Sequence, residues 1–464
     1  MASASIAAPM GATPSKTTLA EDLRSLLRSP RELWLLYLAT FLEWLGIFSF
    51  LPTLTLWLTG DFGMDDRTAG WWAAIFATAM VGLVVVVGSV ADAFGVRNTL
   101  ILSFALAAVT RLGMALAGSP GSAIAWLMLF AFAYASISPV VQTAIQRASS
   151  SRTRAFAFSL WYVSFNLGGA LAGPLVIDPI RRAFLDPATG KLIRREVPLP
   201  LLGARPMSAY AAILGLGFAF AVGGLLATLL LRRGFEERTD PEDAGAPARK
   251  RAFFSALVEA ARDRFFWRFI LLMVFLSLVR MMFQHMHFTW PKYVLREQGE
   301  AFPVGTVWSL NSLLILFLAP ITTAWTRHRR PFEVLLLGAF VSALSPFVLC
   351  LGSSLPFQVA MILVLTLGEA LWSPRLYEYN VAIAPRGREA TYVSLAMLPY
   401  FLAKFLVGPA SGYLLEAFCP AQGPRHPALL WAMIGLSTMV GPVGILAGRR
   451  WMTGERPAAR AAAA

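Results

Sequence analysis

Long apolar stretches alternate with short polar segments along almost the whole chain, and this alternation predicts its architecture. A helix needs about 20 apolar residues to cross ~30 Å of hydrocarbon. Stretches of this kind cover residues 31–58, 69–91, 97–117, 122–146, 154–177, 207–231, 267–291, 303–326, 332–352, 355–384, 390–417 and 427–448. The longest polar stretch between them, 232–266, divides them six and six. The pattern predicts an all-α membrane protein with twelve transmembrane helices in two six-helix halves.

The remaining segments complete the expected domain organisation. Residues 1–30 form an N-terminal tail, in which Thr18 and Glu21 have capping-box spacing and start an amphipathic helix at about 19–29. The first half spans 31–231, the linker 232–266, the second half 267–450 and the C-terminal tail 451–464. The loop 178–206 has a turn signal beside a short β-prone run, so a small hairpin and a plain loop are both open.

Composition agrees with a membrane protein, because only 14% of the residues are charged and 57% are hydrophobic. Soluble proteins have about 25% charged residues. The net charge of +14 requires no nucleic acid, because Lys and Arg concentrate in the segments that become cytoplasmic if both termini lie inside. We therefore expect an integral protein of the plasma (inner) membrane with cytoplasmic termini. Cys350 and Cys419 fall near the outer ends of their predicted helices, but spacing alone does not fix a disulfide.

Charged residues inside the predicted spans point to a function at the middle of the membrane. Glu43, Arg111, Arg280, Glu369 and Lys404 come out at similar depth. An ionisable side chain at the bilayer centre costs roughly 2.5–3.5 kcal/mol on insertion scales, and it usually faces a bundle interior or a wet cavity. The sequence therefore predicts a charge-lined central cavity between the two halves.

Polar side chains near this layer are candidates for binding a solute. In the seventh span, Arg280, Gln284 and His287 are spaced i, i+4, i+7 and share one helix face. The full set of candidates is Arg111, Tyr162, Asn166, Arg280, Gln284, His287, Trp290, Asn311, Arg375 and Lys404. The chain lacks zinc-ligand spacing, a phosphate loop and a nucleophile motif, so no metal, no cofactor and no enzyme activity are predicted.

Each candidate also has a structural interpretation. Arg111 could pair with an acid and hold two helices together. Glu369 and Glu378 are about nine residues apart and face opposite ways unless Pro374 kinks the helix, so one of them could be structural. A polar His287 could be an ordinary hydrogen-bonded side chain, and Trp290 could anchor its helix at the membrane interface.

The segment between the second and third spans carries a recognisable motif. Its sequence GSVADAFGVR, from Gly88 to Arg97, resembles the G-x-x-x-D-x-x-G-x-R loop of the major facilitator superfamily. The six-plus-six pattern around a basic linker resembles the same superfamily. The resemblance implies that Asp92 and Arg97 form a latch on the cytoplasmic side that gates movement of the two halves.

Within that superfamily, the chain resembles the proton-coupled oligopeptide transporters. WYVSFNLGG, from Trp161, is similar to their F-Y-x-x-I-N-x-G-S signature. GE at Gly368 and SPRLYEY from Ser373 are similar to their G-E and S-P-x-G-L-E-F motifs, and Phe283-Gln284 with Trp290 is similar to their F-x-Q-x-x-x-x-W region. In that family the later glutamate, Glu378 here, helps to hold the peptide amino group.

Three positions depart from the family pattern. The second acid and the arginine of its first-span motif E-x-x-E-R-F are Gly46 and Ile47, and the lysine of its fourth span is Ser138, before Pro139. The usual carboxylate clamp and part of the proton machinery are therefore absent. Arg111 is a hypothetical replacement for the lost positive charge.

Together these features predict a monomeric secondary transporter with alternating access to a central site. Its expected partners are a small peptide-like, zwitterionic or anionic solute, protons and membrane lipid. Proton coupling would use Glu43, Glu378 and Glu369. The alternatives are an efflux permease for an amphipathic compound, a non-transporting membrane sensor or assembly factor, and a membrane-embedded enzyme with His285 or His287 beside an acid.

Overall fold

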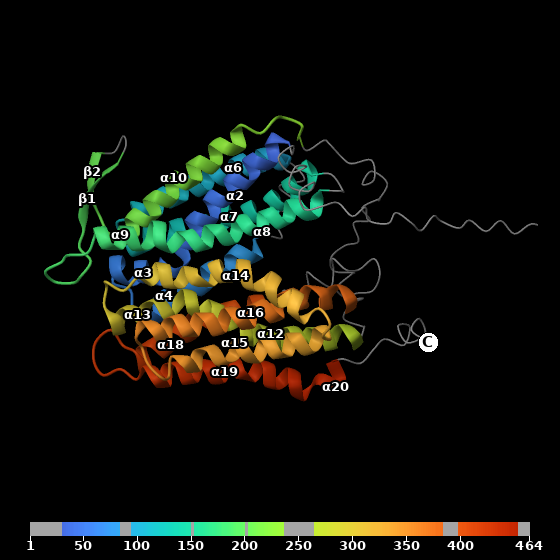
Figure 1. Cartoon of the computed structure of the whole chain (residues 1–464). Coiled ribbons are helices and arrows are strands. Elements are labelled where there is room, and N and C mark those ends of the chain that lie inside the picture. The colour runs from blue at the N-terminus through green and yellow to red at the C-terminus, as the bar shows by residue number, and fades with distance from the viewer. Residues whose placement is uncertain are drawn as a thin grey trace, which may run out of the picture.

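The computed structural model describes residues 30–83, 94–149, 153–199, 203–235, 264–383 and 398–452, and these form a bundle of long helices with one small hairpin (Figure 1). Every predicted span has a helix in the described part. In the first half these elements are α2 Arg31–Phe50, η1 Leu51–Thr53, α3 Leu54–Phe62, α4 Asp66–Gly82, α6 Val96–Ala115, α7 Pro120–Ala148, α8 Arg154–Ala172, η2 Gly173–Ile177, α9 Asp178–Ala183, β1 Arg195–Leu199, β2 Gly203–Met207 and α10 Ala209–Leu229.

The second half has a comparable series of helices. These are α12 Arg264–Phe288, α13 Trp290–Gln298, α14 Val304–Thr326, α15 Pro331–Val348, α16 Leu355–Ile383, α18 Leu398–Phe418, α19 Pro427–Ala447 and α20 Arg449–Met452. By length and hydropathy, 10 of the described helices can cross a membrane, and α4 and α18 occupy the second and eleventh predicted spans. The structure thus has the predicted all-α membrane fold.

Prolines shape two spans that the sequence predicts as single helices. The first span contains Pro52 within the 3₁₀ turn η1, so it runs as α2 followed by α3. The fifth span passes through the π-helical turn η2, which contains Pro174, and continues as α9. A proline lacks the N–H that an α-helix needs, so the backbone hydrogen bonds change around it. Pro374 lies inside α16, which stays helical through it.

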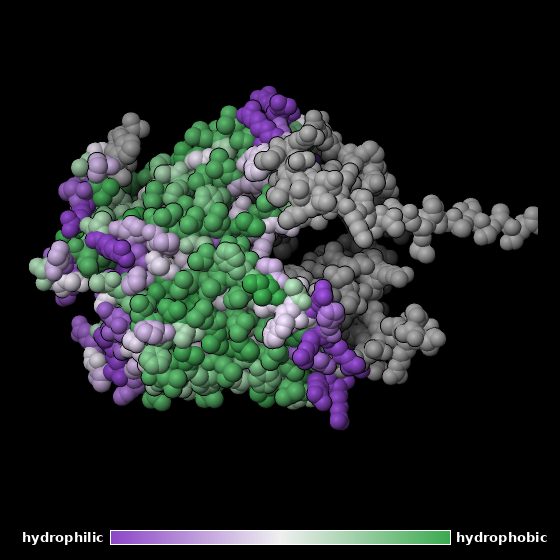
Figure 2. All heavy atoms as spheres, viewed as in Figure 1, coloured by the Kyte–Doolittle hydropathy of each residue, from purple (hydrophilic) through white to green (hydrophobic). Residues whose placement is uncertain are grey.

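The loop 178–206 contains the β-hairpin that the sequence left open. We call the end of the bundle that carries this hairpin the outer end, after the orientation that the sequence predicts. Strands β1 and β2 are antiparallel, with Arg195 opposite Met207 and Leu199 opposite Gly203. The hairpin projects beyond the helices at one end of the molecule (Figure 1). On the face seen in Figure 2, a broad band of apolar residues covers the middle of the molecule, and hydrophilic residues gather at both ends, as expected for a chain that spans a bilayer.

Close helix contacts hold the outer ends of the two halves together. Helix α4 of the first half packs against α18 of the second, and α8 packs against α14. A Cβ atom on Gly70 would overlap the backbone carbonyl of Gly408, and a Cβ atom on Gly173 would overlap that of Gly305. Such small residues let backbones approach closely in a membrane, where the apolar lipid gives helices little hydrophobic reason to associate.

Candidate functional site

In the described part of the first half, the charged mid-membrane layer consists of one ion pair. Helix α2 supplies Glu43 and α6 supplies Arg111, whose two Nη atoms donate to the two carboxylate oxygens at 2.8 and 2.7 Å. Their side chains are only 2% and 1% exposed, and the guanidinium also lies 4.9 Å from the ring of Phe130. The geometry matches the structural interpretation of Arg111, because both groups are already satisfied by each other.

The second half presents a different carboxylate. The Nδ2 atom of Asn311 on α14 donates to Glu369 Oε2 at 3.0 Å and to Thr366 Oγ1 at 3.0 Å. Arg280 on α12 acts electrostatically on Glu369, and its guanidinium lies 5.9 Å from the ring of Trp372. Glu369 therefore has a neutral amide as its hydrogen-bond donor where Glu43 has a bidentate cation.

A series of aromatic ring contacts crosses from the first half to the second. Phe48 of α2 contacts Phe165 of α8, with ring centres 5.1 Å apart, and Trp308 of α14, at 5.6 Å. Trp308 in turn contacts the ring of His287, at 5.4 Å. These contacts connect the two halves near the predicted mid-membrane layer.

Several candidate residues do not present a free polar group to that layer. Trp290 is fully buried and donates to Gln358 Oε1 at 2.7 Å, so its side chain has no accessible surface with which to bind a solute. Arg375 bonds the carbonyl of Thr323 and the hydroxyl of Thr326. Asn166 is buried and donates to the carbonyl of Tyr162.

The structure describes some of the other predicted site residues and leaves two of them undescribed. Tyr162 is 43% exposed on α8, Gln284 is buried on α12, and Lys404 on α18 lies close enough to His287 to act on it electrostatically. Arg97 donates to the carbonyls of Leu231 and Leu229, at the end of α10. The side chain of Glu378 and the whole of Asp92 lie outside the described residues, so their roles stay predictions.

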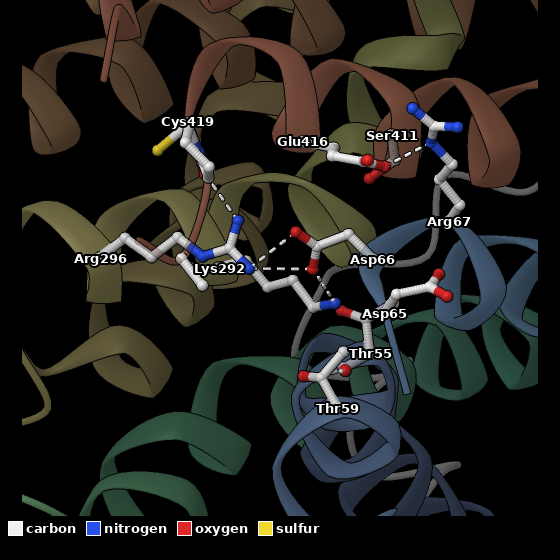
Figure 3. Close-up of polar contacts among 12 residues, drawn as sticks. Thr55, Thr59, Asp65, Asp66, Arg67, Lys292, Arg296, Ser411, Glu416 and Cys419 are labelled. Carbon is white, nitrogen blue, oxygen red and sulfur yellow. Dashed lines mark hydrogen bonds and ion pairs between the residues drawn. The ribbon is translucent and has the colours of Figure 1, made fainter. Parts of the chain in front are cut away.

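An ion cluster at the outer end joins the two halves and centres on Asp66 (Figure 3). This carboxylate begins α4 and accepts from Lys292 Nζ at 2.8 Å and from Arg296 Nη2 at 2.8–2.9 Å, both on α13. Arg296 also donates to the carbonyl of Cys419 at 2.6 Å. Beside it, Arg67 pairs with Glu416 of α18. We call Asp66, Lys292 and Arg296 the outer cluster.

Burial and charge oppose each other within the outer cluster. Burial alone would raise the pKa of the Asp66 carboxyl, but the charges of Lys292 and Arg296 hold it below its ordinary value. Burial lowers the pKa of Lys292 to about 8, although Asp66 counteracts this effect. The carboxylate therefore stays ionised at physiological pH, and Lys292 is the member of the pair that can lose its charge under mildly alkaline conditions.

Two further contacts close the outer end beside α8 and α14. Arg181 of α9 is buried, bonds Glu300 Oε2 at 2.5 Å and also bonds the carbonyl of Phe302. The carboxylate of Asp178 accepts from the backbone N–H groups of Gly305 and Thr306 at 2.8 and 2.7 Å. These are two of the first N–H groups of α14, which have no partner within their own helix.

We call these contacts the outer seal; they are the outer cluster, the pair Arg67–Glu416, and the contacts of Arg181 and Asp178. The sequence does not single out its members, because they resemble ordinary loop charges. Asp66 and Arg67 lie just before a predicted span, whereas Lys292 and Arg296 lie just after another, more than 200 residues later. The available signal was the spacing of Lys292 and Arg296, which places two cations on one helix face. Cys350 and Cys419, for which a disulfide was conceivable, are both free thiols.

The chain is similar to known membrane proteins over most of its length. A family model described as Major Facilitator Superfamily matches residues 36–408. The uncharacterized MFS-type transporter YqjV of Bacillus subtilis is 20% identical over 419 residues, which cover 88% of this chain and 91% of that protein. The multidrug resistance protein MdtH of Aeromonas hydrophila is 21% identical over 409 residues, which cover 88% of this chain and 93% of that protein.

Solved structures of transporters share the fold. A peptide transporter POT in complex with alafosfalin aligns with a TM-score of 0.70 and 17% identity, and covers 91% of this chain and 95% of that chain. The nucleoside transporter NupG aligns with a TM-score of 0.69 and 14% identity, and the alignment covers 91% of this chain and 100% of that chain. The family match and the membrane-crossing helices thus define an integral membrane protein of the transporter class. The chain belongs to the major facilitator superfamily.

Removing the Asp66 charge is expected to open the outer end. In Asp66→Asn, two buried or partly buried cations lose their counter-ion, a change that typically costs 2–5 kcal/mol. Cys419, which is buried and whose carbonyl accepts from Arg296, then becomes accessible, and a membrane-impermeant maleimide should label it at least about tenfold faster in a Cys350→Ser background. Asp65→Asn, which changes the exposed neighbouring cap of α4, is the control. Equal labelling of the two variants would exclude a seal at Asp66.

Proposed function

We propose that this protein is a proton-coupled secondary transporter that moves a small organic solute across the plasma membrane by alternating access. The observation that supports this best is a sealed outer end above a buried layer of charged and aromatic groups. Ion pairs link α4 to α13 and α18, and α9 to the segment before α14, so opening outward requires specific contacts to break. A protein with no transport cycle has no evident need for so many breakable contacts between its halves.

We assign the principal proton site to Glu369. The two mid-membrane carboxylates differ in their partners. Glu43 accepts two hydrogen bonds from the guanidinium of Arg111, so a proton site there would have to break a buried ion pair. Glu369 instead accepts from the neutral Asn311 and lies within electrostatic reach of Arg280. A movement of α12 relative to α16 changes the distance between Arg280 and Glu369, and thereby couples proton binding to conformation.

Proton coupling is tested with the purified protein in liposomes that contain a pH-sensitive dye. The probes are alanyl-alanine, 5-aminolevulinic acid and uridine, since solved neighbours include transporters in complex with a peptide conjugate and 5-aminolevulinic acid and a nucleoside transporter. At least one probe should drive proton movement across the membrane in the wild type. Probes that raise the melting temperature without moving protons would contradict proton coupling.

Glu369→Gln is expected to separate coupling from transport. Glutamine keeps the shape and accepts from Asn311, but it cannot bind and release a proton. The variant should lose proton-driven accumulation entirely and keep exchange of labelled for unlabelled solute, which needs no net proton movement. Thr366→Val, which removes the other acceptor of the same Asn311 amide, is the control and should accumulate solute. Accumulation by Glu369→Gln would remove Glu369 from the coupling mechanism.

An efflux permease is the second candidate, and the similarity to a multidrug resistance protein over 88% of the chain favours it. The same liposomes distinguish the two. An exporter of this kind accumulates an amphipathic dye against its gradient in inside-out vesicles and ignores the peptide and nucleoside probes.

A further inference from the structure

A basic pocket lies at the end of the bundle that faces the cytoplasm in the predicted orientation, opposite the outer end. It forms where α2 begins, α7 ends and the chain leaves α10, and it has a volume of about 210 Å³. Among the residues that line it are Glu32, Ala148, Arg232, Arg233 and Phe235. Figure 2 shows hydrophilic residues gathered at this end of α10. The transport cycle proposed above gives this pocket no role.

Positive charge dominates the pocket. Arg232 and Arg233 are both exposed, and Glu32 is the one acid among the lining residues that the structure describes. Arg232 Nε lies 3.6 Å from Glu32 Oε1, and the arginine side chain is 72% exposed, so water screens this ion pair and makes it weak. Two arginines against one acid leave an excess positive charge that a bound anion can neutralise.

Two other arginines nearby have a structural explanation. Arg31 donates to the carbonyl of Leu230 at 3.5 Å, and Arg97 donates to the carbonyls of Leu231 and Leu229 at 2.8 and 3.0 Å. At the end of a helix such carbonyl groups run out of partners within the helix, and its dipole favours a cation there. The end of α10 therefore accounts for Arg31 and Arg97, and it does not account for the two arginines that line the pocket.

Apolar side chains beside the pocket face outward. Trp34 and Leu38 are exposed one turn apart on α2. Leu226 and Leu230 are exposed one turn apart on α10, which packs against α2. In a chain that spans a bilayer, such side chains meet lipid tails, and tryptophan is enriched where the tails meet the head groups. The pocket begins where these apolar surfaces end, which is the level of the lipid head groups.

We propose that this pocket binds the phosphate head group of an anionic phospholipid, whose acyl chains lie along α2 and α10. The planar guanidinium of arginine can donate two parallel hydrogen bonds to a phosphate, and basic pockets between helices on the cytoplasmic side bind anionic head groups in this way. The volume is below the ~300–1,000 Å³ typical of pockets that enclose a whole drug-sized ligand. The pocket therefore suits a head group better than a transported solute.

The test measures binding and heat stability of the full-length protein purified in detergent. The probes are phosphatidylglycerol, the uncharged phosphatidylcholine, and glycerol 3-phosphate, which has a phosphate and no acyl chains. Phosphatidylglycerol should raise the melting temperature, as a ligand of the folded state must, and should bind at least about tenfold more tightly than phosphatidylcholine. Glycerol 3-phosphate at the same concentration should do neither. Equal binding of the two lipids, or equal stabilisation by glycerol 3-phosphate, overturns the proposal.

Two matched double variants locate the site. Arg232→Gln with Arg233→Gln removes two exposed charges from the pocket. Arg329→Gln with Arg330→Gln removes two exposed charges from the turn between α14 and α15, at the same end of the bundle. A basic side chain near a membrane surface is worth roughly fivefold in affinity, so the first variant should bind phosphatidylglycerol about thirtyfold more weakly. The second should bind like the wild type. Equal loss in both would show attraction to the whole basic face and refute a defined pocket.

Glu32→Gln tests the same assignment in the opposite direction. Glutamine removes the acid that competes with the phosphate for Arg232. Binding of phosphatidylglycerol should therefore tighten at least about twofold, the scale of an exposed ion pair, whereas damage to the fold would weaken it. Unchanged or weaker binding would show that the phosphate does not lie beside Arg232. These measurements need neither a proton gradient nor a solute, so their outcome is independent of the proposed transport function.

Discussion

Replacing Glu43 with glutamine is expected to destabilise the protein by about 3–5 kcal/mol, the usual effect of breaking a buried ion pair. Glu43 and Arg111 exchange two short hydrogen bonds and are almost inaccessible to water. Glutamine fills the same space, but it leaves the guanidinium charge without a counter-ion in the membrane interior. Gly46 lies against this guanidinium, so the arginine has little room to find another partner.

The measurement is the melting temperature of the purified variant, together with its yield from the membrane. The control is the double variant Glu43→Gln with Arg111→Met, which removes both charges and should recover most of the lost stability. Apolar replacement of a whole buried pair is often neutral or stabilising. If Glu43→Gln alone is as stable as the wild type and loses only proton-driven accumulation, then Glu43 carries the proton after all.

The apolar runs predict most of the fold, because the bilayer fixes how long and how apolar a crossing helix must be. The depth of Glu43 and Arg111 follows from the same counting. Their pairing does not, because it depends on how α2 and α6 are rotated about their axes, which side-chain packing determines. The rotation of a helix about its axis also explains Trp290. Counting residues predicts its depth in the membrane, but not that its indole faces Gln358 in the protein interior.

The outer seal is harder to predict than the central layer. A charge in mid-span is conspicuous because the membrane makes it costly, whereas a charge at a span end is ordinary. Asp66 and Lys292 are 226 residues apart, and only the packing of α4 against the second half brings them together. Gly70 and Gly408 carry the corresponding packing signal, but glycines are frequent in all membrane helices.

Gly70→Ala is expected to prevent closure of the outer end and to reduce transport to a small fraction of the wild-type rate. The added Cβ atom would overlap the backbone carbonyl of Gly408, and on the facing helix Gly408 in turn lies against Ala74. Because both neighbours are parts of packed helices, α4 and α18 must move apart. Overpacking of this kind costs about 1–3 kcal/mol, which shifts the balance between closed and open forms by roughly five- to 150-fold.

The control for Gly70→Ala is Gly82→Ala on the same helix, where a Cβ atom would meet nothing within 4 Å. This variant should transport normally and gain slightly in stability, because alanine favours a helix over glycine by about 1 kcal/mol. Labelling of Cys419 in the Cys350→Ser background reports the outer end directly, and it should speed up in Gly70→Ala and stay slow in Gly82→Ala. Fast labelling in both variants, or in neither, would show that the contact between α4 and α18 does not control the outer end.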